Sequence, residues 1–200
     1  LDNYVIMPMT INGSGTITGL SAGGLPANSV TAATCNFSPG KILQVVQTKK
    51  TDTQYWENIS EGDFGGAVCS TDITPSSANN FILIQANLSA STNSTHDLRT
   101  QIFKGGSVLS TATGNADSSK TRVTSTVNRG GEPGSATLTC LHLDPCTGWT
   151  SGALTYDIRL GHWDNADKSI GLNHTWNWDS NNAAWVARAA SHLILMEVAA

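Results

Sequence analysis

Residues 187–200 read ARAASHLILMEVAA, and the aliphatic strand within them guides the interpretation of the whole chain. With the two-residue period of a β-strand, one face carries His192, Ile194, Met196 and Val198, and the other carries Leu193, Leu195 and Glu197. Both faces are largely apolar, whereas a surface strand of an isolated sandwich alternates between apolar and polar residues. We therefore expect one face in a sandwich core and the other against a second copy of the chain, with Leu193, Leu195 and Glu197 at that subunit interface.

The rest of the main domain, residues 41–200, consists of strand-length runs separated by turn residues. The runs are KILQVVQTKK (41–50), GAVCSTDI (66–73), FILIQANLSAS (81–91), HDLRTQIFKGG (96–106), SVLSTA (107–112), TRVTSTVNR (121–129), ATLTCLHL (136–143), ALTYDIRLGHW (153–163), IGLNHTWNWD (170–179) and SHLILMEV (191–198). Abundant Ser, Thr, Asn and Gly, with only 13% charged residues, favour short strands and tight turns over helices. The pattern predicts an all-β fold, an antiparallel β-sandwich of jelly-roll-like type.

Residues 1–40 have a different texture. They hold no long apolar run and are interrupted by Gly and Pro, so alone they could not bury enough surface to fold. Apolar residues nevertheless recur through them, as at Ile11, Ile17 and Leu20. We expect an extended N-terminal arm that docks on a partner; a flexible tether is the alternative.

Charge and hydropathy exclude several kinds of partner. A formal net charge of -4 and a pI near 5.6, with the basic residues scattered, predict no nucleic-acid surface. No apolar run reaches the 18 residues of a membrane span, so we expect no membrane insertion. The first residues show neither the basic start nor the apolar stretch of a secretory signal, so we expect nothing in them that directs secretion.

The sequence also lacks recognisable catalytic chemistry. It contains no G-x-S-x-G, no H-E-x-x-H and no phosphate loop, and most acidic residues lie in turns. His142 within CLHLDPC (140–146) raises the question of zinc, but free buried thiols are the better interpretation of the four cysteines. The stretch DNADKS (164–169) lacks the spacing of a calcium loop. We expect a protein that is not an enzyme and has no metal or cofactor.

Tryptophan is concentrated late in the chain, with five of the six between Trp149 and Trp185. Indole rings beside amides and carboxylates suit carbohydrate, because the ring stacks on the sugar while polar groups bond its hydroxyls. The candidate glycan or receptor residues are Trp149, Trp163, Asp164, Asn165, Asn181 and Trp185. Trp176 and Trp178 share one strand face, and each could equally be core.

Four segments together resemble a known family. They are INGSGTITGLSAGGLPANSV (11–30), PGKILQVVQTKKTDT (39–53), TDITPSSANNFILI (71–84) and ASHLILMEV (190–198), and they cover both ends and the first half of the main domain. Together they resemble virion proteins of tailed phages, of the short tail fibre and head fibre or capsid decoration types, marine and cyanobacterial phages among them. The resemblance implies homotrimers of jelly-roll-like domains on the virion surface, attached to other virion proteins through their N-terminal segments.

The leading hypothesis is therefore a trimeric virion fibre or decoration protein that contributes to host-surface attachment. A secreted lectin-like sandwich is the alternative, favoured by six N-x-S/T sequons, and a glycan-cleaving enzyme is the third. For Glu197 we expect a cationic partner, Arg159 or Arg188, or else exposure to solvent at the end of its strand.

Overall fold

The computed structural model describes residues 40–128, 134–175 and 187–200. The chain divides into two units, residues 1–37 and 38–200, and all described residues belong to the second. The expected N-terminal arm therefore lies outside the described residues, except for Gly40.

The described residues form strands and one short 3-10 helix. The elements are β1 (Ile42–Lys50), β2 (Gln54–Ile59), β3 (Phe64–Ile73), β4 (Phe81–Thr92), β5 (Asp97–Lys104), β6 (Ser107–Val108), η1 (Ser110–Ala112), β7 (Ser125–Asn128), β8 (Gly134–Pro145), β9 (Leu154–Trp163), β10 (Lys168–Leu172) and β11 (Ser191–Val198). In the part of the chain that the structure describes, no helix has the length and apolar character needed to cross a membrane.

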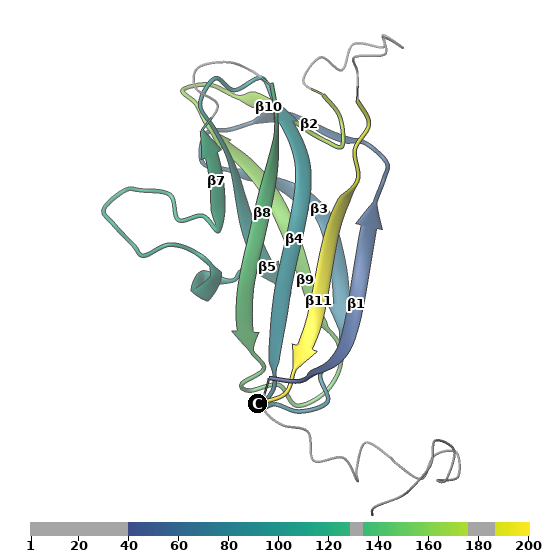
Figure 1. Ribbon diagram of the computed structural model, residues 1–200. Coiled ribbons are helices and arrows are strands. Elements are labelled where there is room, and N and C mark those ends of the chain that lie inside the picture. Colours follow the sequence, from purple (N-terminus) through teal and green to yellow (C-terminus); the bar gives the residue numbers. More distant parts are fainter. Residues whose placement is uncertain (1–39, 129–133, 176–186) are drawn as a thin grey trace, which may run out of the picture. The chain divides into compact units, whose positions relative to one another are not determined.

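The strands form two antiparallel sheets that pack as a sandwich (Figure 1). In the first sheet the order is β1-β11-β4-β10-β2, and β8 pairs with the other edge of β4. The second sheet has the order β3-β9-β5-β6, and β7 also pairs with β5. Figure 1 shows β8, β4, β11 and β1 side by side in one layer, with β3, β9 and β5 in the layer behind.

The connectivity is that of a jelly roll. Outgoing strands pair with returning strands in nested fashion, β1 with β11, β3 with β9, β4 with β8 and β5 with β7, and successive pairs alternate between the two sheets. This is a long antiparallel ribbon rolled into a double sheet. The expected all-β, jelly-roll-like sandwich is therefore confirmed, and β2 and β10 extend the first sheet at one end.

Alternation along the central strands builds the core. In β4, Ile82, Ile84, Ala86 and Leu88 are completely buried, and the residues between them face outward. The same alternation in β11 places Leu193 and Leu195 in the core. The core of the two-layer sandwich is therefore built from the residues on one face of each strand.

The burial of Leu193 and Leu195 shows that the predicted subunit interface was wrong. The two leucines belong to the buried core cluster of their own chain, as do Ile82, Ile84 and Ile158, and have no exposed surface. The period-two grouping was right, but both faces of β11 are apolar, so the sequence did not indicate which face points inward. The face that remains partly exposed carries Ile194, Met196 and Val198.

Glu197 shares the inward face and is 1% exposed, and it contacts neither predicted arginine. Its Oε1 accepts hydrogen bonds from the backbone N–H of Ser76 (2.7 Å), the Ser76 hydroxyl (2.8 Å) and Asn80 Nδ2 (2.6 Å), and its Oε2 accepts one from Gln44 Nε2 (2.6 Å). Both earlier expectations for Glu197, a cationic partner or exposure, were wrong. Burial tends to raise the pKa of Glu197, but these donors outweigh it and hold the pKa below its usual value.

Three cysteines lie within the described residues, and all three, Cys69, Cys140 and Cys146, are buried free thiols, as expected. Burial raises the pKa of Cys69 to about 11, so its thiol stays protonated at neutral pH. Thr100 Oγ1 lies 3.1 Å from Cys140 Sγ. Cys35 lies outside the described residues.

Candidate functional site

The outward surface of the first sheet is unusually apolar for a surface. Residues that pair across antiparallel strands share a face, and the pairings align three rows across β8, β4, β11 and β1. The rows are Leu143–Leu83–Met196–Val45, Pro145–Phe81–Val198–Ile42 and Leu141–Gln85–Ile194–Gln47. We call these twelve residues the apolar outer face.

Much of this face is open to solvent in the single chain. Leu141 is 66% exposed, Val45 55%, Ile42 49% and Leu143 47%. None of the three rows contains a charged residue. The fourth row along these strands, Thr139–Asn87–His192–Lys49, is polar and contains the charged Lys49. Contiguous exposed apolar surface of this kind marks an association site in soluble proteins.

The outward surface of the second sheet has the opposite character. Asp97, Arg99 and Gln101 face outward from β5, and Arg159 lies over the Phe103 ring, 3.9 Å from its centroid. The segment after η1 crosses part of this surface, where Gln101 Nε2 donates to the Arg122 carbonyl (2.5 Å). The two sides of the sandwich therefore have different preferred surroundings, one apolar and one aqueous.

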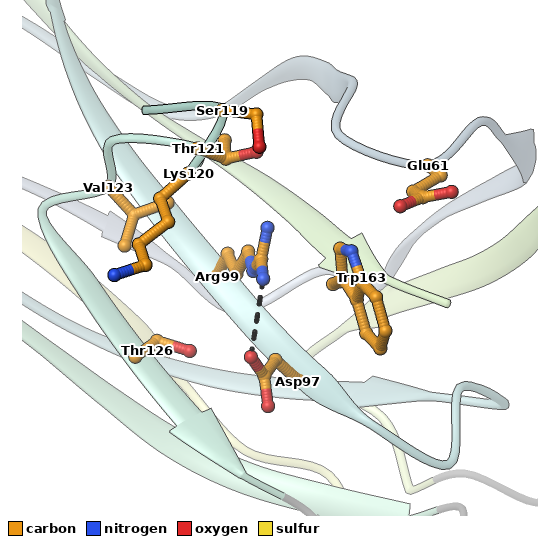
Figure 2. Close-up of a pocket in the computed structure, with 9 residues that line it drawn as sticks. All are labelled: Glu61, Asp97, Arg99, Ser119, Lys120, Thr121, Val123, Thr126 and Trp163. Atoms are coloured by element: carbon orange, nitrogen blue, oxygen red, sulfur yellow. Dashed lines mark hydrogen bonds and ion pairs between the residues drawn. The ribbon is translucent and has the colours of Figure 1, made fainter. Parts of the chain in front are cut away.

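An open pocket of about 600 Å³ lies on this polar side, at the end of β9 (Figure 2). Its walls come from four separate parts of the chain: the β2–β3 loop, β5, the segment that leads into β7 together with β7 itself, and the end of β9. The lining residues are Glu61, Asp97, Arg99, Ser119, Lys120, Thr121, Val123, Thr126 and Trp163.

Trp163 forms one wall of the pocket, with 36% of its surface exposed. The His96 ring meets it edge to face, at 5.0 Å between centroids and 80° between planes, a favourable aromatic arrangement. Trp163 is paired with Asp97 across β9 and β5. Figure 2 shows Trp163 and Glu61 on one side of the pocket, and Lys120, Thr121 and Val123 on the other.

Arg99 and Asp97 form the floor between these walls (Figure 2). Arg99 Nη2 donates to Asp97 Oδ2 at 3.3 Å, and Asn128 Nδ2 donates to Asp97 Oδ1 at 3.0 Å. Arg99 Nη1 is shielded from solvent and has no hydrogen-bond acceptor among the described residues. Lys120 pairs with Asp117 at the mouth, where both side chains are exposed.

The structure separates the predicted glycan residues. Trp163 lies at the pocket, whereas Trp149 is half-buried against the core and donates from Nε1 to the Gly152 carbonyl (2.8 Å). Asn165 is exposed on the β9–β10 loop. Asn181 and Trp185 lie outside the described residues, as do Trp176 and Trp178.

Asp164 is buried, and its carboxylate is bonded within its own fold. Its carboxylate accepts hydrogen bonds from the backbone N–H groups of Thr95 (3.4 Å) and Asn165 (2.7 Å), and Lys168 Nζ lies 3.3 Å away. Burial tends to raise the pKa of Asp164, but Lys168 and the backbone donors outweigh it and lower the pKa to about 2. Asp164 therefore clamps the β4–β5 loop to the β9–β10 loop and places Trp163 beside the pocket.

Four charged residues of the pocket, Glu61, Asp97, Arg99 and Lys120, were not identified from sequence. They come from segments far apart in the chain, and no local motif marks them. The one available signal was the placement of Asp97 and Arg99 two residues apart, on the outward side of a strand whose other face carries Leu98 and Thr100.

No protein-family model matches the chain, and no curated protein matches it. A chain in the solved structure of infectious bursal disease virus, Gx strain, is similar over 88% of this chain, with 17% sequence identity and a TM-score of 0.38. This chain spans 42% of the length of that viral chain. A likeness this weak carries no argument about function.

Proposed function

We propose that the protein is a non-catalytic structural component of a virus particle, a trimeric fibre or decoration head at the virion surface. The observation that carries the proposal is the apolar outer face, an uncharged surface of four strands with strongly exposed aliphatic side chains. The resemblance of residues 11–30, 39–53, 71–84 and 190–198 to phage virion proteins supports the viral setting. The same resemblance is the reason for proposing an assembly of three copies.

The occupant of the apolar outer face, in this proposal, is two further copies of the same chain. Four strands about 4.8 Å apart, with three rows about 7 Å apart, cover about 400 Å². This is about half of what each partner contributes to a standard protein interface, about 800 Å². The face is therefore large enough to form the apolar centre of a subunit contact, with the polar fourth row at its rim.

A trimer would bury the apolar outer face, which is otherwise unfavourable on a particle surface exposed to water. Around a threefold axis each copy would turn the apolar outer face inward and keep the charged second sheet outward in water. Ile194 and Met196 then take the role that the sequence suggested for Leu193 and Leu195. The arm, residues 1–40, would attach the head to other virion proteins.

One of the six N-x-S/T sequons that favour the secreted lectin-like alternative is not accessible for glycosylation. Asn173 is completely buried, and its Nδ2 donates to the carbonyls of Lys50 (2.8 Å) and Asp52 (3.0 Å), so it cannot carry a glycan in the folded chain. Jelly rolls serve lectins as well as virions, and the fold by itself does not choose between them.

The test is the location of the chain. Antibody-gold labelling of intact particles, with mass spectrometry of the purified particles, should place it at the particle surface in multiples of three copies. Particles with the substitution Leu141→Glu should lose the label, because three copies of a carboxylate would lie in an apolar contact. The matched control is Thr137→Glu, on the same strand and face but outside the three rows, which should keep it. Detection of the chain only as a free secreted protein would refute the proposal.

A further inference from the structure

The pocket beside Trp163 has features that a structural role does not explain. Arg99 occupies its floor with one nitrogen bonded to Asp97 and another, Nη1, shielded and without an acceptor among the described residues. A charged donor without an acceptor is unfavourable for folding. Nη1 itself is closed to the pocket, and a ligand would meet the 14% of the Arg99 side chain that stays exposed there. Trp163 keeps 36% of its surface exposed in the same pocket, although both its chain neighbours, His162 and Asp164, are buried.

We propose that this pocket binds a neutral saccharide, with a sugar ring stacked on Trp163 and its hydroxyls bonded to the floor. This inference rests on the proposed function, a head at the virion surface, and specifies a ligand for the host-surface attachment hypothesised from the sequence. The binding itself requires only the described head domain.

The shape and the aromatic wall suit a sugar. A volume of about 600 Å³ is within the range of small-ligand sites, and the pocket is open on one side, as a chain of linked sugars requires. The His96 ring packs edge to face against the indole and favours this orientation of its face. An apolar ring surrounded by polar groups matches the alternating apolar and polar faces of a pyranose.

The pocket lining contains both hydrogen-bond donors and hydrogen-bond acceptors. Arg99 and Lys120 donate, Glu61 and Asp97 accept, and the hydroxyls of Ser119 and Thr121 do both. Each sugar hydroxyl is both donor and acceptor, so a mixed lining can satisfy several at once.

The balance of charge decides against an acidic sugar. Two cations and two carboxylates line the pocket, and both cations are already paired, Arg99 with Asp97 and Lys120 with Asp117. A carboxylate or sulfate on the ligand would be repelled by Glu61 and Asp97 as well as attracted by Arg99 and Lys120, so it would gain no net advantage over a neutral ligand. A neutral ligand avoids this and uses the same carboxylates as acceptors.

The experiment uses the full chain on an array of neutral, sialylated and sulfated glycans, followed by calorimetric titration with the soluble form of the strongest neutral glycan. We expect binding to neutral glycans, with Trp163→Ala lowering the affinity about tenfold or more. Tyr55→Ala removes an aromatic side chain of similar exposure, 40%, from β2 and should leave the affinity unchanged. Arg99→Lys keeps the charge but loses the planar fork, and should weaken binding without unfolding the chain.

Each outcome has a defined meaning. Preferential binding of sialylated or sulfated glycans, no binding to any glycan, or equal loss in the Trp163 and Tyr55 variants would each overturn the saccharide inference. Sugar binding and assembly are tested separately, because the affinity per site in solution does not depend on assembly. A monomeric Leu141→Glu chain should bind sugar with the same affinity per site and lose only the avidity of three linked heads.

Discussion

Replacing Glu197 with Gln tests how a jelly roll without a partner cation can hold a carboxylate in its core. The substitution keeps the shape of the side chain and removes the charge. A glutamine carbonyl can replace Oε1, which accepts from Ser76 and Asn80, but its amide NH2 then faces Gln44 Nε2, donor against donor.

The magnitude follows from these contacts. One hydrogen bond to a charged acceptor, worth about 1.5–3 kcal/mol, is lost, and the other three weaken because their acceptor becomes neutral. We expect the free energy of unfolding to fall by about 2–4 kcal/mol at pH 7. Glu57→Gln, at an exposed position of β2, should change it by less than about 0.5 kcal/mol.

The assay is urea unfolding followed by circular dichroism, at one fixed chain concentration because assembly adds to apparent stability. The folded-state pKa of Glu197 lies below its usual value of 4.5, so the carboxylate stabilises the fold above pH 4.5. This contribution is lost as the pH falls through the folded-state pKa. The difference between the wild type and the Gln variant should therefore narrow in acid. A Gln variant as stable as the Glu57 control at pH 7 would refute the buried network.

Further predictions concern the packing and the thiols. Gly161→Ala should lower the free energy of unfolding in urea by about 1–3 kcal/mol, because a Cβ there would lie 2.6 Å from the Asp63 carbonyl oxygen. The control Gly114→Ala has open space around it and should not destabilise the fold, and equal effects of the two substitutions would contradict this packing. Tyr156→Phe should cost about 1–3 kcal/mol, since the Tyr156 hydroxyl donates to buried Asp144 at 2.6 Å, and an unchanged urea midpoint would argue against that bond. The three described cysteines are buried, so a thiol reagent at pH 8 should modify at most one thiol per folded chain and all four after denaturation; two reactive thiols in the folded chain would contradict this.

The fold was predictable because its main signal is local. In the stretch 81–91, alternate residues are apolar, and β4 follows this alternation along its length. β2 (Gln54–Ile59) was not predicted, because QYWENI places polar residues next to its aromatic rings and shows no clean alternation. It is a strand because β10 pairs with it, a contact between residues more than 100 positions apart.

The sites were less predictable for two physical reasons. β11 is apolar on both faces, and only its pairing with β4 and its packing against β3 of the second sheet determine that Leu195 points inward and Met196 outward. The pocket depends on register, since Trp163 meets Asp97 only when β9 pairs with β5. The tryptophan was a visible candidate, but the charged groups around it come from distant segments.

The central claim is that the apolar outer face joins copies of the chain, and sedimentation equilibrium of the 200-residue chain tests it most directly. The account predicts a particle of three times the chain mass of 21.0 kDa at micromolar concentration, and a single-chain mass for the variant Leu141→Glu. A wild-type protein that sediments as a single chain at that concentration would contradict it, as would a trimer whose mass is unchanged by Leu141→Glu combined with Val45→Glu.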